Sequence, residues 1–256
     1  MDDLKIRPYQ AGDAGAVAAL MNDLETRFGA EAGFTEPEVR DRNGPDAHRW
    51  DTDTRLILGT SGELVAMGYI DPPPPGGNKA FVSGGVHPDW RSRGIGRDLF
   101  GWQLERLAEM RGDADWEVET GAPELDEQAA HFYARHGFKP VRYFSDMYAA
   151  LGPVDAAPLP DGLRATEYRA DLSRRLYDAH MEAFEDHWGY QRRPYEKWVA
   201  YTVESESFRS DLTRVVFDGD QIAGYVMSYD GADGKLYIGQ VGTRRPWRRQ
   251  GYCLGV

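Results

Sequence analysis

Between positions 86 and 96 the sequence reads Val86-His87-Pro88-Asp89-Trp90-Arg91-Ser92-Arg93-Gly94-Ile95-Gly96. An apolar run that favours a strand leads into this stretch, and a helical pattern leaves it and continues to Arg111. Gly94 and Gly96 let the backbone come close to a ligand, and the helix N-terminus that they open favours an anion. Three arginines add positive charge that matches phosphate oxygens: Arg91, Arg93 and Arg97. The stretch therefore predicts a loop that binds a pyrophosphate.

A glycine-rich turn with surface arginines would have the same local pattern. The stretch lacks the Lys-Ser/Thr ending of a P-loop and the spacing of the dinucleotide-binding motif. Two neighbouring features favour the ligand-binding interpretation. Gly84 and Gly85 lie in the strand before the loop, where paired glycines mark a bulge or a close ligand approach. Further along, Tyr133 lies one turn before Gly137, which ends a helix.

The run Val86-His87-Pro88-x-x-Arg91-x-x-Gly94-x-Gly96, followed by Phe132-Tyr133-x-x-x-Gly137-Phe138, resembles the GNAT superfamily of acyl-CoA-dependent N-acyltransferases. The resemblance covers essentially all of residues 1–150. It implies acetyl-CoA as co-substrate. It also implies that the end of the strand pairs with the pantetheine arm, through Gly85, Val86 and His87. The loop would then hold the pyrophosphate, through these residues: Arg91, Ser92, Arg93, Gly94, Ile95, Gly96 and Arg97.

Tyr133 occupies the tyrosine position of the family, and the resemblance implies that it protonates the departing CoA thiolate. A phenol hydrogen bond that strengthens as charge develops would stabilise the transition state, and an ordinary helix-packing aromatic is the alternative. A base is also required, because an amine must be neutral to attack. Glu119 and Glu117 lie on one strand, on the face opposite Trp116 and Val118. Glu119 is favoured because it is nearer the strand end that faces the helix of Tyr133, although either carboxylate would suit a solvated sheet face.

The apolar patterns predict strands at 4–8, 55–59, 64–70, 81–86, 116–120 and 138–147, a helix after the N-cap Asp13, and helices at 94–111 and 126–136. This order favours an α/β fold with a mixed sheet. The resemblance implies the GNAT fold, a mostly antiparallel sheet flanked by helices. Residues 1–150 are therefore expected to form one complete domain.

A second copy of the same design follows a linker. Trp90, Arg91 and Gly94 recur as Trp247, Arg248 and Gly251 at an offset of 157 residues, which is a domain length. The stretch 151–162 is rich in proline and glycine and favours a linker. Residues 163–256 are expected to form the N-terminal part of a second GNAT domain, with these elements: strands at 163–168, 213–217, 222–229 and 236–243, and a helix at 172–184.

The second copy departs from the first at Cys253, where the family has glycine or alanine. It also lacks the later strands and the helix that would carry a tyrosine. An open half-sheet is an aggregation hazard unless it is covered. We therefore expect either a second domain truncated from a longer protein, or an edge covered by the first domain or by a second chain in a homodimer. The two-copy layout resembles that of the mycothiol synthases in architecture alone.

The composition is that of a soluble globular protein, with 41% hydrophobic and 28% charged residues. No run approaches the roughly 20 apolar residues of a membrane span. The start Met1-Asp2-Asp3-Leu4-Lys5 has no apolar signal core, so a cytoplasmic protein that needs no membrane is expected. One cysteine and scattered histidines offer no metal cluster. The net charge of −12 disfavours nucleic acid as a partner and suits a cationic amine.

The sequence thus predicts an N-acetyltransferase that moves an acetyl group from acetyl-CoA to the primary amine of a small molecule, by direct attack in a ternary complex. A protein that binds or senses acyl-CoA without catalysis would keep the same loop, and Tyr133 favours the enzyme. Peptide or protein N-acetylation is a third reading. For it, an acidic region where the family builds its acceptor site would receive basic chains: Glu25, Glu31, Glu36 and Glu38.

Overall fold

Five strands form the sheet of the first half of the chain: β1 Lys5–Arg7, β2 Thr54–Leu58, β3 Leu64–Asp71, β4 Lys79–Val86 and β5 Glu117–Glu119. They lie in the order β1-β2-β3-β4-β5, with β1 to β4 antiparallel and β5 parallel to β4. The computed structural model describes residues 4–29, 33–41, 50–150, 152, 158–231 and 234–250. The predicted mixed, mostly antiparallel sheet is confirmed.

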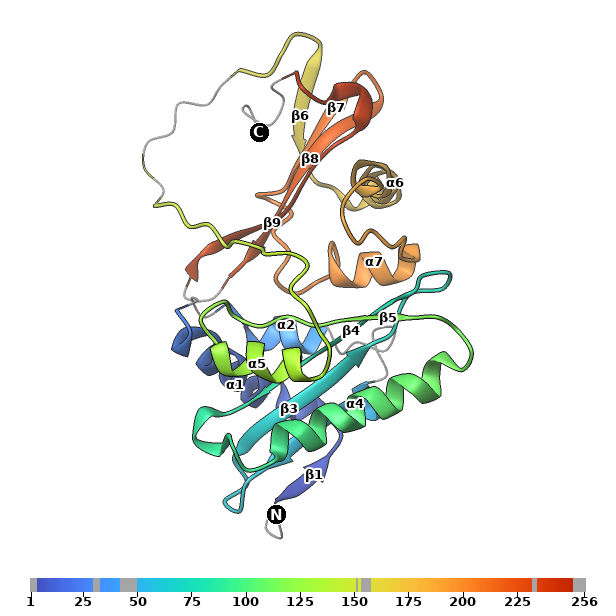
Figure 1. Cartoon of the computed structure of the whole chain (residues 1–256). Helices are drawn as coiled ribbons and strands as arrows, with labels where there is room; N and C mark the ends of the chain where they lie inside the picture. Colours follow the sequence, from blue (N-terminus) through green and yellow to red (C-terminus); the bar gives the residue numbers. More distant parts are fainter. Residues whose placement is uncertain are drawn as a thin grey trace.

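Helices cover both faces of this sheet (Figure 1). α1 Ala14–Arg27 and α2 Glu36–Asp41 lie on one face, and α4 Ile95–Arg111 lies on the other. The first half therefore has a hydrophobic core on each face of the sheet. Side chains alternate between the two faces along β3, so that Met67 packs against α1 and α2 whereas Ile70 packs against α4. Shorter elements complete this half: α3 Trp50–Asp53, α5 Glu127–Arg135, and the 3-10 turns η1 Ala11–Asp13 and η2 Pro88–Trp90.

The second half repeats the first four strands: β6 Leu163–Glu167, β7 Arg214–Asp218, β8 Gln221–Asp230 and β9 Leu236–Thr243. Their order, β6-β7-β8-β9, and their antiparallel pairing match those of β1 to β4. The pairing of the second and third strands contains a register shift in each copy, between Ile57 and Leu58 in one and between Val216 and Phe217 in the other. Helices and turns accompany these strands: α6 Ser173–Phe184, α7 Tyr195–Tyr201, η3 Ala170–Leu172 and η5 Arg245–Trp247.

His180 lies in the core of the second half, where α6 packs on β8. It is 9% exposed, its Nδ1 is 2.6 Å from the hydroxyl oxygen of Tyr225, and its ring stacks on Phe184 at 4.6 Å. Burial, with a smaller contribution from the charge of Arg193, lowers the pKa of His180 from 6.5 to about 4. The folded protein therefore keeps this imidazole neutral at pH values where the unfolded chain protonates it.

We expect the free energy of unfolding to fall as the pH falls from about 6.5 towards about 4. In this window the unfolded chain binds a proton that the folded state does not, which costs the fold up to about 1.4 kcal/mol per pH unit. Urea unfolding at about pH 6.5 and about pH 5 should show a loss of roughly 2 kcal/mol from this group, absent in His180→Gln. His131→Gln, at an exposed position, should keep the wild-type slope. A wild-type slope in His180→Gln would contradict the assignment.

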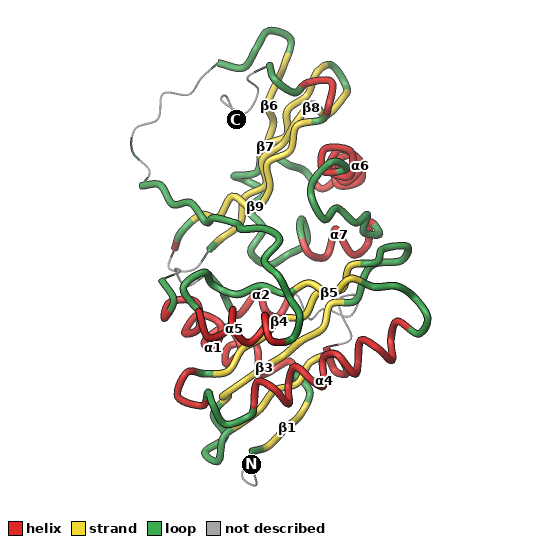
Figure 2. Tube along the Cα trace, in the orientation of Figure 1, coloured by secondary structure: helices red, strands yellow, loops and turns green. Residues whose placement is uncertain are grey.

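The predicted strand at 138–147 is wrong. This stretch has no regular secondary structure and runs as a loop from the end of α5 along the second half (Figure 2). β5 is only three residues long and offers little edge for a further strand. The stretch instead contacts the second half, because Arg142 lies 4.8 Å over the ring of Trp188 and Phe144 lies 6.3 Å from the same ring. Tertiary contacts have thus overridden a local β pattern.

Asp13 stands at the N-cap of α1, as predicted, but its side chain does not cap that helix. Its carboxylate instead accepts two hydrogen bonds of 2.6 Å from Arg7 and one of 2.7 Å from the Gln10 N–H.

Some predictions fall outside the described residues: most of the linker (151 and 153–157), Glu31, and the end of the second loop from Gly251 to Cys253. Within the described ranges, each helix is too short or too polar to cross a membrane.

The two halves meet at the start of β4, which the loop before α7 contacts. The side-chain amide of Gln191 accepts from the Lys79 N–H and donates to the Lys79 carbonyl, both at 3.1 Å. The Lys79 ammonium lies 4.6 Å over the Trp188 ring. An ion pair of 3.2 Å between Arg40 and Glu206 adds a second link. The start of β4 is therefore joined to the second half through its backbone as well as its side chain.

Candidate functional site

β4 and β5 separate before β4 ends. They pair over three residues, from Lys79–Glu117 to Phe81–Glu119, and β5 stops there. β4 continues through residues 82–86, with β3 as the one strand paired to it in the described part of the chain. Backbone N–H and C=O groups on the open side of β4 therefore line a slot, in which an extended ligand could pair as an added strand would.

Gly84 lies beside this slot and has a φ of 140°. A Cβ at this position would collide with the carbonyl oxygen of Met67 on β3. Gln103 of α4 holds β3 and β4 together next to Gly84, because its Nε2 donates to the carbonyls of Tyr69 on β3 at 2.9 Å and Ser83 on β4 at 2.8 Å. The neighbouring strand therefore requires this glycine, whether or not a ligand is bound.

The loop from 88 to 94 turns the chain from β4 into α4. Ser92 and Gly94 both have left-handed backbone conformations, with φ of 62° and 85°. Gly94 is the N-cap of α4 and has no side chain to cap the helix. The N–H groups of the first turn of this 17-residue helix, which lack intrahelical partners, favour an anion there. This geometry fits a phosphate-binding loop.

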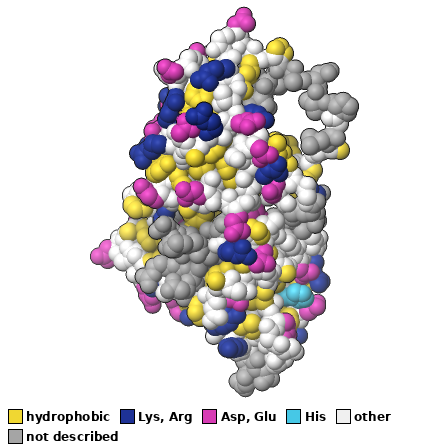
Figure 3. All heavy atoms as spheres, turned by 180° about the vertical axis from the view of Figure 1, so that it is seen from behind, with side chains coloured by type: hydrophobic (Ala, Val, Ile, Leu, Met, Phe, Trp, Pro, Cys, Tyr) yellow, Lys and Arg dark blue, Asp and Glu magenta, His cyan; other side chains and the backbone are white. Residues whose placement is uncertain are grey.

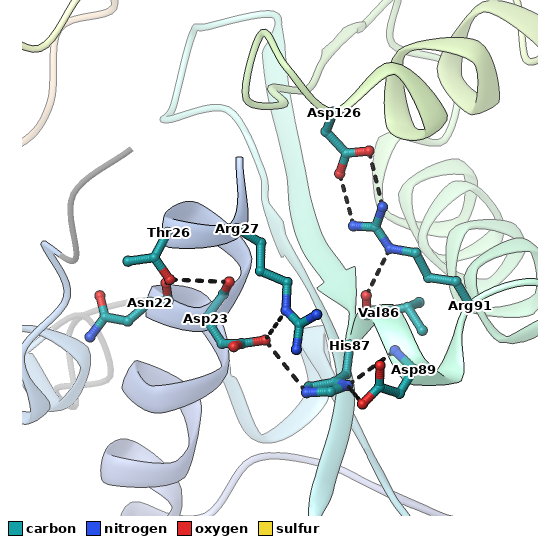
Figure 4. A network of polar contacts seen from close by, with 9 residues as sticks. All are labelled: Asn22, Asp23, Thr26, Arg27, Val86, His87, Asp89, Arg91 and Asp126. Atoms are coloured by element: carbon teal, nitrogen blue, oxygen red, sulfur yellow. Dashed lines mark hydrogen bonds and ion pairs between the residues drawn. The ribbon is translucent and has the colours of Figure 1, made fainter. Parts of the chain in front are cut away.

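Arg91 is held by the protein at the end of β4 (Figure 4). Its guanidinium forms a two-point ion pair with Asp126, at 2.8 and 3.0 Å, and its Nε donates to the Val86 carbonyl at 3.1 Å. Asp126 is buried, and as the N-cap of α5 it also accepts from the Ala129 N–H at 3.0 Å. Arg91 thus ties β4 to α5, the helix that carries Tyr133. Its predicted contact with phosphate stays a prediction.

Two other arginines beside the loop lie at the surface. Arg93 lies 4.6 Å over the ring of Trp90, and Arg97, 71% exposed along its side chain, pairs with Asp98 at 3.1 Å. Both can move towards a ligand at small cost, because exposed contacts of this kind are weak. Ile95 is buried in the core and anchors α4, so its side chain serves the fold.

His87 joins the end of β4 to α1 (Figure 4). Its Nε2 lies 3.4 Å from the carboxylate of Asp23, and its Nδ1 accepts from the Asp89 N–H at 3.3 Å. Both ring nitrogens are therefore engaged within the protein. Any contribution of His87 to a pantetheine arm would come from its backbone.

Tyr133 lies on α5 and packs against α4. Its ring meets Phe100 edge to face at 5.7 Å and lies 6.0 Å from Phe138. Burial raises the pKa of the Tyr133 phenol above its usual value. The phenol therefore stays protonated at neutral pH and can donate a hydrogen bond or a proton.

Glu119 lies on the other face of the same edge. Its carboxylate pairs with Lys79 at 2.8 Å, and Glu117 lies 3.5 Å from the same ammonium. The hydrogen bond with Glu119 raises the pKa of Lys79. Trp116 and Val118 pack on the α4 side with Tyr133, which agrees with the predicted alternation. To accept a proton from an amine, Glu119 would have to give up part of its contact with Lys79.

The second loop repeats the backbone detail of the first. The Arg248 Nε donates to the Thr243 carbonyl at 3.0 Å, as Arg91 does to Val86, five residues back in each case. Arg249 has a φ of 64°, like Ser92 at the equivalent place. The acidic partner differs, because Arg248 pairs with Asp186, next to α6. The described part of this loop thus has the shape of the first.

The predicted acidic region is divided among several roles. Glu25 is half-buried on α1, and burial raises its pKa. Glu36 pairs with Arg40 at 2.5 Å. Glu38 accepts from both the N–H and the hydroxyl of Thr35. Among the residues that the structure places, no three His, Cys, Asp or Glu side chains gather as metal ligands would.

The sequence did not point to Asp126 or Lys79, which hold Arg91 and Glu119 respectively. Asp126 carried one usable signal, since an Asp before an apolar helix is a common N-cap. Its ion pair with a residue 35 positions earlier has no local signal.

Residues 54–140, from β2 to just beyond α5, match the family model of the acetyltransferase (GNAT) domain. No curated protein sequence matches the chain. The chain is similar to the crystal structure of a GCN5-related N-acetyltransferase from Sphaerobacter thermophilus, with 25% identity, a TM-score of 0.72, and coverage of 98% of this chain and 79% of that one. It is also similar in fold to a tandem GNAT protein from the clavulanic acid biosynthesis pathway, with 18% identity, a TM-score of 0.59, and coverage of 99% and 82%.

Proposed function

We propose that this chain, which carries a GNAT acetyltransferase domain over residues 54–140, transfers an acetyl group from acetyl-CoA to the primary amine of a small molecule. The observation that carries the proposal is the open edge of β4 at 82–86, which leads directly into the glycine N-cap of α4. An extended ligand could form hydrogen bonds with the open backbone edge of β4, and a pyrophosphate at its end could bind at the N-terminus of α4. Basic and acidic side chains are interspersed on the face in Figure 3, and the net charge of −12 suits a cationic amine.

In this reaction the neutral amine forms a C–N bond at the thioester carbonyl, and the C–S bond breaks. Tyr133 would donate its proton to the leaving thiolate, a role for which its protonated phenol is suited. Glu119, or a water that it positions, would accept the proton that the amine loses. Arg91 would act through Asp126 by fixing the helix of Tyr133, and Arg93 and Arg97 would neutralise phosphate charge.

Gly96→Asp should weaken acetyl-CoA binding by about 10-fold or more, because a carboxylate at the start of α4 repels phosphate. The fold should tolerate it, since a Cβ at Gly96 lies at an ordinary 3.6 Å from Val86 and an acidic residue favours a helix N-terminus. Gly96→Ala is the matched control that adds a methyl group without charge. Calorimetric titration with acetyl-CoA measures both variants. Equal binding by Gly96→Asp and the wild type would remove this loop from the proposed site.

Release of CoA from acetyl-CoA, measured against a panel of small amines and basic peptides, tests the whole proposal. Release with a small amine supports the proposed transferase, and release with peptides alone would assign the acceptor to proteins. Acetyl-CoA binding without release from any acceptor would instead support a protein that binds acyl-CoA without catalysis.

A further inference from the structure

A cavity of about 610 Å³ lies between the two halves of the chain. The first half contributes Glu38, Tyr69 and Asp71, and the second half contributes residues from α6, α7, β8, β9 and the loop between α6 and α7. This volume is within the range of pockets that hold small organic ligands. Neither half forms the cavity alone.

The floor of the cavity lies next to the open slot of β4. Tyr69 is paired with Ser83, which precedes Gly84, and Asp71 is paired with Phe81. Phe81 is in turn the partner of Glu119 at the last pair before β4 and β5 separate. A ligand in the cavity would therefore lie against the strand pair at which the acyl group of the proposed co-substrate would end.

Two buried polar atoms of the lining have no hydrogen-bond partner. Trp198 is 3% exposed and its Nε1, a donor, is unpaired, and the Oε1 of Gln240, an acceptor, is also unpaired. An unsatisfied buried group costs about 1–3 kcal/mol. A ligand with its own donor and acceptor would remove that cost. The cavity thus has the character of a binding site rather than a packing defect.

The lining also defines the chemistry of the ligand. Eight of its residues are Phe, Tyr or Trp, which favours a flat apolar body. Two carboxylates, Glu38 and Asp71, lie on the side of the first half, where the reaction would occur, whereas Arg193 lies on the side of the second. This division favours an ammonium group towards the first half. His180, which faces the same cavity, is occupied at Nδ1 by Tyr225.

We infer that this cavity is the acceptor site and that it takes an aromatic primary amine carrying a hydrogen-bonding group, with the second half forming the wall that selects it. The inference rests on the proposed acetyl transfer. It assigns to the second copy a role in choosing the acceptor that requires no catalytic residue of its own.

The test uses the full chain with tyramine, phenethylamine and butylamine as acceptors. The kcat/KM for tyramine should exceed that for butylamine by about 10-fold or more, because aromatic burial and stacking are lost with the alkyl amine. Tyr237→Ala should lower this ratio about 10-fold. Tyr148→Ala should leave it unchanged: Tyr148 is 59% exposed, against 54% for Tyr237, and does not line the cavity.

Trp198→Phe keeps an aromatic ring but removes the unpaired donor. It should lower kcat/KM for tyramine and leave that for phenethylamine, which lacks the hydroxyl, nearly unchanged. Thermal unfolding of each variant checks the fold, and Tyr237→Ala remains informative if Trp198→Phe is unstable.

Calorimetry separates failure of this inference from failure of the proposed function. If acetyl-CoA binds and CoA is released, but tyramine and butylamine are used equally and Tyr237→Ala changes nothing, the cavity is not the acceptor site and the transferase stands. If acetyl-CoA does not bind, the proposed function fails and the acceptor assignment falls with it. Tyramine binding by the wild type, lost in Tyr237→Ala and kept in Tyr148→Ala, supports the assignment.

Discussion

Replacing Tyr133 by Phe should lower the turnover number of acetyl transfer by about 100-fold, with little change in the affinity for acetyl-CoA. The phenol would donate its proton as negative charge develops on the leaving sulfur, so its loss removes an interaction of the transition state and not of the bound ground state. The aromatic ring stays, and with it the packing on Phe100. Steady-state and single-turnover CoA release measure the effect.

The pH profile gives an independent check on this role. Burial raises the pKa of Tyr133 above 10, and the protonated form is the competent one, so ionisation of this group should reduce turnover only above pH 10. Tyr143→Phe, at a position that is 73% exposed, is the matched control and should behave as the wild type. A Tyr133→Phe variant with wild-type turnover from pH 6 to pH 10 would remove Tyr133 from the chemistry.

Gly84→Ala should lower the free energy of unfolding by about 3 kcal/mol or more. A residue with a side chain at a φ of 140° is strained by about 1–3 kcal/mol, and its Cβ would in addition collide with the Met67 carbonyl. β4 could relieve the collision only by moving away from β3. That movement would distort the slot, so acetyl-CoA affinity should fall together with stability.

Gly101→Ala is the control for this change. Gly101 lies within α4, has no positive φ, and a Cβ there would meet nothing within 4 Å. Alanine in a helix is better than glycine by up to about 1 kcal/mol, so this variant should be more stable than the wild type. Urea unfolding of both variants decides the matter. If Gly84→Ala is as stable as Gly101→Ala, the close approach of β3 and β4 is wrong.

The fold of the chain was largely predictable from local patterns. Alternation and helical spacing located β1 to β5, α1, α4 and α5, and the offset of 157 residues anticipated the second four-stranded sheet. The strand expected at 138–147 did not form, because a strand also needs a partner and β5 is only three residues long. α7 was not predicted, since its seven residues are too few for a clear period.

The candidate site was predictable in its backbone but not in its side-chain partners. Glycine spacing indicated a loop at the start of α4, and this depends on neighbouring residues alone. The pairs Arg91–Asp126 and Lys79–Glu119 join residues 35 and 40 positions apart, and no local pattern encodes such a contact. The cavity between the halves depends on residues from both copies, so only the folded chain could reveal it.

The two arginine loops have a consequence for how such proteins diversify. In each copy the arginine donates a hydrogen bond to a carbonyl five residues earlier, while its acidic partner lies next to a different helix, α5 in the first copy and α6 in the second. The carbonyl that holds the arginine lies within the same stretch of chain, whereas the carboxylate that pairs with it comes from a neighbouring part of the fold. A gene duplication can therefore copy the turn intact and change its surroundings, so one copy is free to acquire a new task while the other keeps the old one.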